Sequence, residues 1–408
     1  MRLLISFAAI FVSVVLMQLG SGGVVPLDAL SGVELGFSAS AIGMIGSAHF
    51  LGFLIGCWWT PRLMGEVGHS RAFAALTAAG TIGILAHMMV TDPIAWGVFR
   101  MATGLSAAGC YTIIEAWLQG KLTNANRGSA MGVYRIVDIG GSLAAQMMIG
   151  FLAPASYFSY NLLALLACAA LFPLVLTKVE APKSSLAPRL RPMLAWKRSP
   201  LGAVGVVVSG VTGGAFRMVG PLYGVAVGLE PKQIGAFLSA YVIGGAVAQF
   251  PMGWLSDKYD RRTVLAWLSA GSVAACVFTV FAQDFGIWAV FAGATLFGLT
   301  TMPLYSISSA HANDFSNDDE RVELSAALLF LYAIGAIASP VIASALMESF
   351  GPGGMFGLNA AAHFALLIFG LMRMRVGRQP ENPTAWTYRP KTSFLFGRLM
   401  RKPRRPEQ

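Results

Sequence analysis

The stretch LGFSASAIGMIGSAHFLG, residues 35–52, occurs a second time in diverged form as VGLEPKQIGAFLSAYVIG, residues 227–244. Six of the eighteen positions are identical when one copy is laid over the other. Another pair follows in the same order and at nearly the same spacing, GLSAAGCY (104–111) over GLTTMPLY (298–305). Matches that keep one order and a nearly constant spacing indicate an internal duplication. We therefore expect two halves with the same order of helices.

The composition indicates a membrane protein. Of the 408 residues, 56% are hydrophobic and only 12% are charged, and the mean hydropathy is +0.65. A helix needs roughly 20 apolar residues to cross a hydrocarbon core about 30 Å thick. The sequence predicts twelve such runs, at approximately 3–25, 38–60, 71–90, 93–117, 129–153, 157–176, 200–226, 231–252, 262–282, 286–310, 322–347 and 352–372.

The longest polar break between the runs is rich in proline and basic residues and separates six predicted spans from six. Because each half has an even number of spans, both halves have the same orientation, and such a pair encloses a cleft at the midplane. The predicted fold is an all-α membrane protein with twelve transmembrane helices in two parallel six-helix repeats. Its predicted parts are a first bundle (1–177), a cytosolic basic linker (178–199), a second bundle (200–375) and a polybasic cytosolic tail (376–408).

The distribution of charge predicts the orientation. With the N-terminus inside, 25 of the 29 Lys and Arg residues fall on the cytosolic side, and the outer loops carry six acids. This is the positive-inside pattern, so we expect a multi-pass protein of the plasma (bacterial inner) membrane with both termini cytosolic. The net charge of +10 is then explained by contact with anionic membrane lipids, and no nucleic acid is expected as a partner.

The loop GWLSDKYDRR, residues 253–262, concentrates charge in this apolar chain. It resembles the signature loop of the major facilitator superfamily, Gly-x-Leu-x-Asp-Arg-x-Gly-Arg-Arg, although Lys258 stands for Arg and Asp260 for Gly. RMATGLSAAG, from Arg100, fits a second pattern of that family in the fourth span. The resemblance implies a secondary transporter that works by alternating access. In it, a gating loop would be formed by Gly253, Asp257, Lys258, Arg261 and Arg262.

Two other stretches point to a narrower group. PRLMGEVGHSRAF (61–73) and SSAHANDF (308–315) are similar to a bacterial subgroup of largely uncharacterised, YcaD-like members of that family. The first of these stretches occupies the place of the signature loop in the first half, and there Pro61 replaces the Gly and Gly65 the Asp. The better copy of the loop is therefore in the second half.

Charged side chains inside spans are costly unless they are paired or hydrated, and this makes them functional candidates. Arg100 and Arg217 lie in the fourth and seventh spans, which line the cleft in the superfamily. They are expected to share an anionic substrate group or to act on a proton site, or else Arg217 forms a structural pair with Asp28 or with helix-terminal carbonyls. The resemblance implies a role in proton coupling for Arg100. The predicted substrate and cleft residues are Arg100, Arg217, Tyr111, Tyr305 and Gln18.

A second group of charges lies toward the cytosolic side. Arg135 and Asp138 share one helix face by their i, i+3 spacing, and Glu115 of the neighbouring span lies at a similar depth. Two acids and one base leave one acid in excess, as a proton carrier requires; the alternative is a static salt bridge. With Arg100, Asp28 and His49, these three residues complete the predicted set for proton coupling. His49 is otherwise a polar contact between helices.

Other residue types suggest structure rather than chemistry. Tryptophans near the predicted span ends, Trp58, Trp59, Trp96, Trp117 and Trp254, favour interfacial anchoring. The four cysteines show no paired spacing, and no phosphate-binding loop, metal-ligand cluster or nucleophile motif is found. The sequence thus predicts no enzyme, no cofactor and no metal site.

The function predicted from these observations is secondary active transport of a small solute, coupled to protons, by a monomer. Two directions stay open, which are export of drugs or metabolites and uptake of an anionic or aromatic metabolite or vitamin. A third reading is a non-transporting receptor or scaffold whose active part is the polybasic tail. Charges buried at the expected cleft favour transport over the scaffold, because a scaffold has no need of them.

Overall fold

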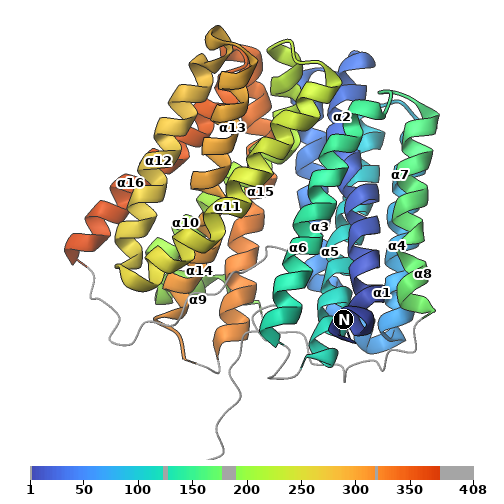
Figure 1. The fold of residues 1–408 in the computed structure, drawn as a ribbon, viewed down its shortest axis with the longest axis horizontal. Coiled ribbons are helices and arrows are strands. Elements are labelled where there is room, and N and C mark those ends of the chain that lie inside the picture. Colours follow the sequence, from blue (N-terminus) through green and yellow to red (C-terminus); the bar gives the residue numbers. More distant parts are fainter. Residues whose placement is uncertain (1, 123–126, 177–189, 318–319, 377–408) are drawn as a thin grey trace, which may run out of the picture.

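The computed structural model describes residues 2–122, 127–176, 190–317 and 320–376, and these form helices joined by short connections, without a strand (Figure 1). The first half consists of α1 (Arg2–Met17), the π-helical turn η1 (Gln18–Gly22), α2 (Gly23–Glu34), α3 (Ala39–Val67), α4 (His69–Ala86), α5 (Pro93–Lys121), α6 (Arg127–Met148), the 3₁₀ turn η2 (Ile149–Phe151), α7 (Tyr157–Ala169) and α8 (Leu171–Val175). Together α1, η1 and α2 make up the first predicted span, and α7 with α8 the sixth.

The second half begins with a short helix in the predicted linker, α9 (Pro192–Arg198). It continues with α10 (Pro200–Ala226), α11 (Pro231–Lys258), α12 (Arg261–Ala282), the 3₁₀ turn η3 (Gln283–Phe285), α13 (Ile287–Thr301), α14 (Leu304–Asn313), α15 (Arg321–Phe350) and α16 (Gly354–Val376). Here α13 and α14 correspond to the tenth predicted span. Most of the linker and of the tail lies outside the described residues.

Nine stretches of the described chain are long and apolar enough to cross a membrane by length and composition, and each corresponds to a predicted span. The other three predicted spans are the helices α4, α5 and α6. Charged side chains that are buried or partly buried lower the hydropathy of α5 and α6. They are Arg100 and Glu115 in α5, and Arg135 and Asp138 in α6. The all-helical, multi-pass fold predicted from the sequence is confirmed.

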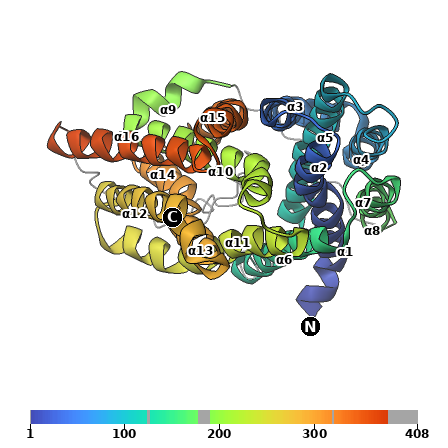
Figure 2. The same ribbon diagram turned by 90° about the horizontal axis from the view of Figure 1, so that it is seen from above.

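Two bundles lie side by side, with α1–α8 forming one and α10–α16 the other (Figures 1 and 2). We call the end of the molecule at the top of Figure 1 the upper end; it carries the short connections 35–38, 87–92, 152–156, 227–230 and 351–353. The opposite, lower end carries the N-terminus and α9.

The duplication is visible in the backbone itself. At the upper end α2 ends before Gly36 and α10 before Gly228, and both glycines have the same left-handed φ of +77°. The residues after them, Phe37 and Leu229, donate N–H bonds of 2.8 and 2.9 Å to carbonyls five residues back. This is the Schellman ending, which favours glycine because a Cβ is strained at positive φ. Gly36 and Gly228 therefore end corresponding helices of the two repeats in the same way.

The two bundles meet closely at the upper end along α3 and α15. A Cβ built on Gly43 would lie 2.6 Å from the carbonyl oxygen of Pro340, and one on Gly46 would lie 2.8 Å from Cβ of Met218. At the rim, the carboxylate of Glu348 accepts bonds from the backbone N–H of Ser40, at 2.9 Å, and from the Ser40 hydroxyl. Small residues at this seam let the helix backbones approach each other.

Candidate functional site

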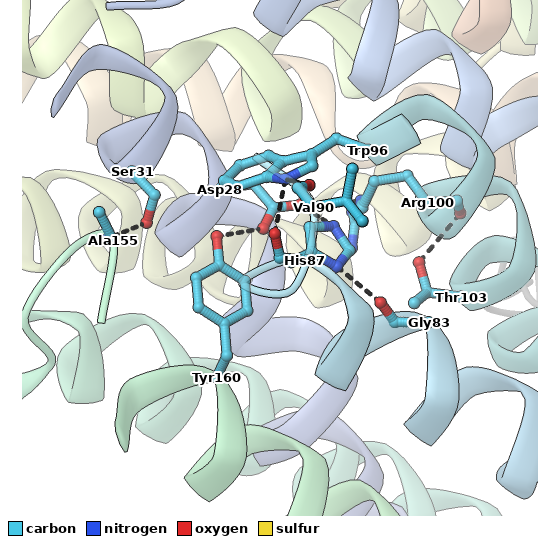
Figure 3. A network of polar contacts seen from close by, with 10 residues as sticks. All are labelled: Asp28, Ser31, Gly83, His87, Val90, Trp96, Arg100, Thr103, Ala155 and Tyr160. Carbon is cyan, nitrogen blue, oxygen red and sulfur yellow. Dashed lines mark hydrogen bonds and ion pairs between the residues drawn. The ribbon is translucent and has the colours of Figure 1, made fainter. Parts of the chain in front are cut away.

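A buried carboxylate, Asp28, is the centre of a polar network in the first bundle (Figure 3). It lies on α2 and is only 5% exposed. Its Oδ2 is 3.2 Å from Nε of Arg100 on α5 and 3.4 Å from Nε2 of His87 at the end of α4. The hydroxyl of Tyr160 on α7 donates to its Oδ1 at 2.8 Å. Four helices of one bundle therefore converge on a single carboxyl group.

His87 is held in one orientation by its surroundings. Its ring is fully buried and stacks on Tyr160, with 5.3 Å between the ring centroids. Nδ1 lies 2.6 Å from the carbonyl oxygen of Gly83, so Nδ1 carries a proton and donates it there. The indole N–H of Trp96 donates to the His87 carbonyl at 2.8 Å, which fixes the backbone of the same residue.

This geometry places a proton-binding atom against the carboxylate. Because Nδ1 of His87 is the donor to Gly83, Nε2 of the neutral ring has a lone pair, and that lone pair faces Oδ2 of Asp28. Two acceptors face each other favourably only when one of them takes up a proton. Arg100 supplies the positive charge that balances Asp28 when no such proton is present. The network therefore places an imidazole lone pair and a guanidinium against one carboxylate oxygen.

Arg100 itself is deeply buried, at 1% exposure. Its Nε makes the ion pair with Asp28, while Nη1 and Nη2 have no hydrogen-bond partner among the described residues. The side-chain hydroxyl of Thr103 donates a hydrogen bond of 2.9 Å to the backbone carbonyl of Arg100. The structure thus pairs Arg100, and not Arg217, with Asp28.

A second polar cluster lies toward the lower end, around Asp138 of α6. Its Oδ2 accepts from Arg135 at 2.8 Å, and its Oδ1 accepts from Gln18 at 2.7 Å and from the Tyr111 hydroxyl at 3.3 Å. Gln18 is the first residue of the π-helical turn in the first span, and such turns often occur at functional sites. Glu115 of α5 is fully buried and lies within electrostatic range of Tyr111.

Arg217 of α10 lies apart from both clusters. Its side chain is exposed, whereas its sequence neighbours Phe216 and Met218 are 2% and 4% exposed. Arg217 lies within electrostatic range of His49 and Tyr111 of the first bundle and of Tyr241 and Tyr332 of the second. Arg217 therefore lies between the bundles, on a helix whose apolar stretch is 72% buried, the largest share of the nine.

His49 and Tyr305 occupy intermediate positions. His49, which is 6% exposed, lies within electrostatic range of both Arg100 and Arg217, and its Nδ1 has no hydrogen-bond partner in the described part of the chain. Tyr305 of α14 is 5% exposed and packs edge-on against Tyr332, with ring centroids 5.5 Å apart.

The predicted gating loop joins α11 to α12 and is anchored within the second bundle. Arg261, only 4% exposed, pairs with Asp257 at 3.3 Å and with Asp314 beyond the end of α14. Arg262 pairs with Asp260 at 2.7 Å, and Asp260 also caps α12 by accepting from the Arg262 N–H. The exposed ammonium of Lys258 and the buried Gly253 take no part in these pairs; Lys258 lies over the ring of Trp254 at 4.8 Å.

The prediction of interfacial tryptophans was wrong for two of the five. Trp96 and Trp117 are 0% and 1% exposed, whereas Trp58, Trp59 and Trp254 are between 41% and 60% exposed. Trp96 belongs to the Asp28 network, and its burial follows from the bonds of its indole N–H to backbone carbonyls. The position of Trp96 near a span end could not reveal its burial, because the carbonyls that it binds, those of His87 and Val90, belong to the connection before α5.

Sequence reasoning also missed Tyr160 and did not place His87 among the residues for proton coupling. Tyr160 lies 132 residues from Asp28, and no spacing rule connects them. Of the residues proposed from sequence, the structure brings Asp28 and Arg100 together in one cluster, and Gln18, Tyr111, Arg135 and Asp138 in another. In the ranges 2–122, 127–176, 190–317 and 320–376, no group of His, Cys, Asp and Glu residues could hold a metal ion.

Comparisons with known proteins give a consistent picture. The family model described as Major Facilitator Superfamily matches residues 202–405, half of the chain. An uncharacterised MFS-type transporter, YcaD, of Escherichia fergusonii is 26% identical over 350 residues, which is 84% of this chain and 88% of the relative. A further uncharacterised MFS-type transporter, from Yersinia pestis, is 27% identical over 353 residues, with the same two coverages.

Solved structures show the same fold. The nucleoside transporter NupG superimposes with a TM-score of 0.74 at 16% identity, covering 92% of this chain and 100% of that protein. A bacterial homologue of the human lysosomal transporter Spinster, in an inward-facing and occupied conformation, gives a TM-score of 0.68 at 15% identity, with coverages of 91% and 97%. At these identities the likeness concerns the fold.

Proposed function

The chain belongs to the Major Facilitator Superfamily, and from this we propose that it is a proton-coupled secondary transporter that moves a small solute by alternating access. The resemblance first indicated by the loop at 253–262 is thereby confirmed, and the family and the structural neighbours are those of multi-pass membrane transporters. Proton coupling and the identity of the solute are the parts that we propose.

The observation that carries proton coupling is the contact between Asp28 and His87. Oδ2 of the buried Asp28 lies 3.4 Å from Nε2 of the buried His87. The same oxygen also faces Arg100. Ionisable groups are retained inside a membrane protein chiefly where ions or protons pass. Each carboxylate is paired with an arginine, Asp28 with Arg100 and Asp138 with Arg135. We assign the proton to the Asp28 network because an imidazole nitrogen also faces the carboxylate there, and we regard the cluster at Asp138 as a second candidate.

Alternating access is supported by the uneven contact between the bundles. The seam of Gly43, Gly46 and Pro340, with Ser40 and Glu348 at its rim, closes the upper end, while Arg217 is exposed between the bundles deeper in the molecule. With the positive-inside orientation, the upper end faces outward and both termini face the cytosol. The gating loop at 253–262 would then stiffen the cytosolic side of the second bundle, because Arg261 and Arg262 pair with acids of that same bundle.

Uptake and export both remain compatible with this architecture. Uptake of an anionic or aromatic metabolite or vitamin is favoured by the exposed Arg217 and its aromatic neighbours, while the apolar spans favour export of lipophilic compounds. We expect the monomer to be the working unit, because one chain supplies both bundles.

The test uses the full-length protein in liposomes that contain a trapped pH-sensitive dye. Carboxylates, sugars, vitamins and lipophilic cations are offered on one side, and proton movement across the membrane is recorded. We expect one class of solute to move protons. Asp28→Asn should abolish accumulation of that solute driven by a pH difference and leave its exchange across the membrane at equal pH, since the asparagine cannot carry the proton.

The matched control is Asp138→Asn, which removes the carboxylate of the lower cluster, where Gln18 donates a hydrogen bond to it. It should retain pH-driven accumulation if Asp28 is the proton site. Accumulation that persists in Asp28→Asn and is lost in Asp138→Asn would move the proton site to the lower cluster. A complete absence of proton movement with every solute class would contradict proton coupling itself.

A further inference from the structure

The cation at Arg217 is the unusual charge of this molecule. It lies nine residues before the end of α10, hence about 14 Å along the helix from the upper end at 1.5 Å per residue. Arg100 is paired with Asp28 and Arg135 with Asp138. Arg217 has neither an ion pair nor a hydrogen bond to any of the described residues. A cation at this depth is costly unless something neutralises or hydrates it.

The groups around Arg217 are of one kind. Tyr111 comes from the first bundle, Tyr241 and Tyr332 come from the second, and all three lie within electrostatic range of Arg217. Tyr241 stacks on Phe216, the residue before Arg217, with 4.1 Å between the ring centroids. Asp138, which accepts from the Tyr111 hydroxyl at 3.3 Å, is already paired with Arg135.

Such surroundings select among solutes by elementary chemistry. A cationic solute would be repelled by Arg217. A neutral, strongly hydrated solute would leave the arginine unpaired and would gain little from aromatic faces. A carboxylate can accept two parallel N–H bonds from the guanidinium, and an aromatic ring can pack against the faces of tyrosine and phenylalanine.

We propose that the solute is an organic anion carrying an aromatic ring, whose carboxylate is held by Arg217 and whose ring packs among Tyr111, Tyr241 and Tyr332. This assignment rests on the proposed transport function and deepens it, because it names the class of compound bound between the two bundles. Since both bundles contribute to the surroundings of Arg217, the anion would also be released when they move apart.

Four probes separate charge from ring. Benzoate has both features, cyclohexanecarboxylate has the charge alone, benzyl alcohol has the ring alone, and benzylamine combines the ring with the opposite charge. Binding to the purified full-length protein is measured by the shift of its melting temperature over a concentration series up to about 10 mM, a range suited to a ligand with few atoms. We expect benzoate to bind best, cyclohexanecarboxylate more weakly, and the other two not at all.

Variants then locate the site. Arg217→Gln should weaken benzoate binding by about tenfold or more, as expected for loss of a charge-assisted hydrogen bond, whereas Arg217→Lys should retain part of the affinity. Arg62→Gln is the matched control, because it removes an exposed arginine that lies over the ring of Trp58. If Arg217→Gln does not purify as a folded protein, the ranking of the four probes and the Arg217→Lys variant decide.

Several results would overturn the assignment. They are equal binding of benzoate and benzyl alcohol, preference for benzylamine, no stabilisation by either carboxylate, or benzoate binding that is the same in Arg217→Gln as in Arg62→Gln. The liposome assay keeps the two proposals apart. Proton movement with a neutral or cationic solute, blocked by Asp28→Asn, would refute the anion and leave transport standing. Benzoate binding at Arg217 without any solute-driven transport would refute transport and leave the anion site standing.

Discussion

One oxygen atom, Oδ2 of Asp28, faces both a guanidinium and an imidazole nitrogen. The guanidinium of Arg100 lies 3.2 Å away and compensates the charge of the carboxylate. His87 differs, because its bond to Gly83 leaves Nε2 with a lone pair that faces the same oxygen. At this scale, the proposed proton coupling rests on these two acceptors facing each other.

His87→Gln should therefore uncouple transport from the proton. The glutamine amide can still donate a hydrogen bond to Asp28, but it has no titrating nitrogen. We expect exchange of the solute at equal pH to persist and the rate to lose its dependence on pH, as measured in liposomes over a pH series. His363→Gln is the control, because His363 is equally buried and hydrogen-bonds Thr212 of α10 instead. A variant at His87 that keeps the wild-type pH profile would rule out a proton role for this imidazole.

Single residues of the network could be named from the sequence, while their partnership could not. Arg100 is visible because a charge inside an apolar run is rare. Asp28 lay beyond the predicted first span, 3–25, and was counted with the outer loops, whereas the structure places it on α2, inside the first spanning helix. Their pairing depends on how α2, α4, α5 and α7 pack, and Tyr160 comes from a span that carries no charge of its own. Trp96 shows the same limit, since its indole bonds to backbone carbonyls, which every residue has.

At the scale of elements, the seam between α3 and α15 depends on the absence of side chains. Gly43 accepts the backbone of Pro340 at a distance that leaves no room for a methyl group. On α6, by contrast, a Cβ at Gly132 would have nothing within 4 Å. Two glycines of helices in the same bundle thus have different reasons to be glycine.

Gly43→Ala should push α3 and α15 apart, at a cost of roughly 1–3 kcal/mol for the closed upper end. Gly132→Ala should be neutral or stabilise its helix by up to about 1 kcal/mol, as alanine does in helices. Melting temperature and the rate of solute exchange report both effects. Equal behaviour of the two variants would show that the seam tolerates a side chain and does not govern closure.

The seventh span was predicted to end at 226, and α10 ends there, two residues before Gly228. The first span was predicted to end at 25, whereas α2 continues to Glu34, two residues before Gly36. The π-helical turn at Gln18–Gly22 was not predicted. At this turn α7 approaches closely, since a Cβ on Gly20 would lie 2.7 Å from the Cα of Ala167. A local pattern cannot reveal such a contact with a helix that is distant in sequence. The same turn directs Gln18 to Asp138, so the lower cluster could be predicted only in part, through the spacing of Arg135 and Asp138.

For the whole molecule, the closed upper end is the state that must open if the protein transports by alternating access. Ser40→Cys with Glu348→Cys places one thiol on each bundle at the rim. A short bifunctional thiol reagent should join them and stop solute exchange, whereas each single variant treated with the same reagent should stay active. The native cysteines Cys57, Cys110 and Cys276 are buried, and Cys168, which is partly exposed, is replaced by alanine in all variants. Undiminished exchange by the cross-linked protein would contradict movement of these two bundles relative to each other.

The proposed proton site and the proposed anion site lie on different bundles, Asp28 with His87 on the first and Arg217 on the second. One proton that travels in the same direction as one monocarboxylate moves no net electrical charge. For such a cycle the membrane voltage contributes nothing, and a difference of one pH unit supports about a tenfold concentration ratio, since it is equivalent to about 1.4 kcal/mol. A single exchangeable proton at Asp28, as proposed, would thus set a ceiling on how far the solute can be concentrated.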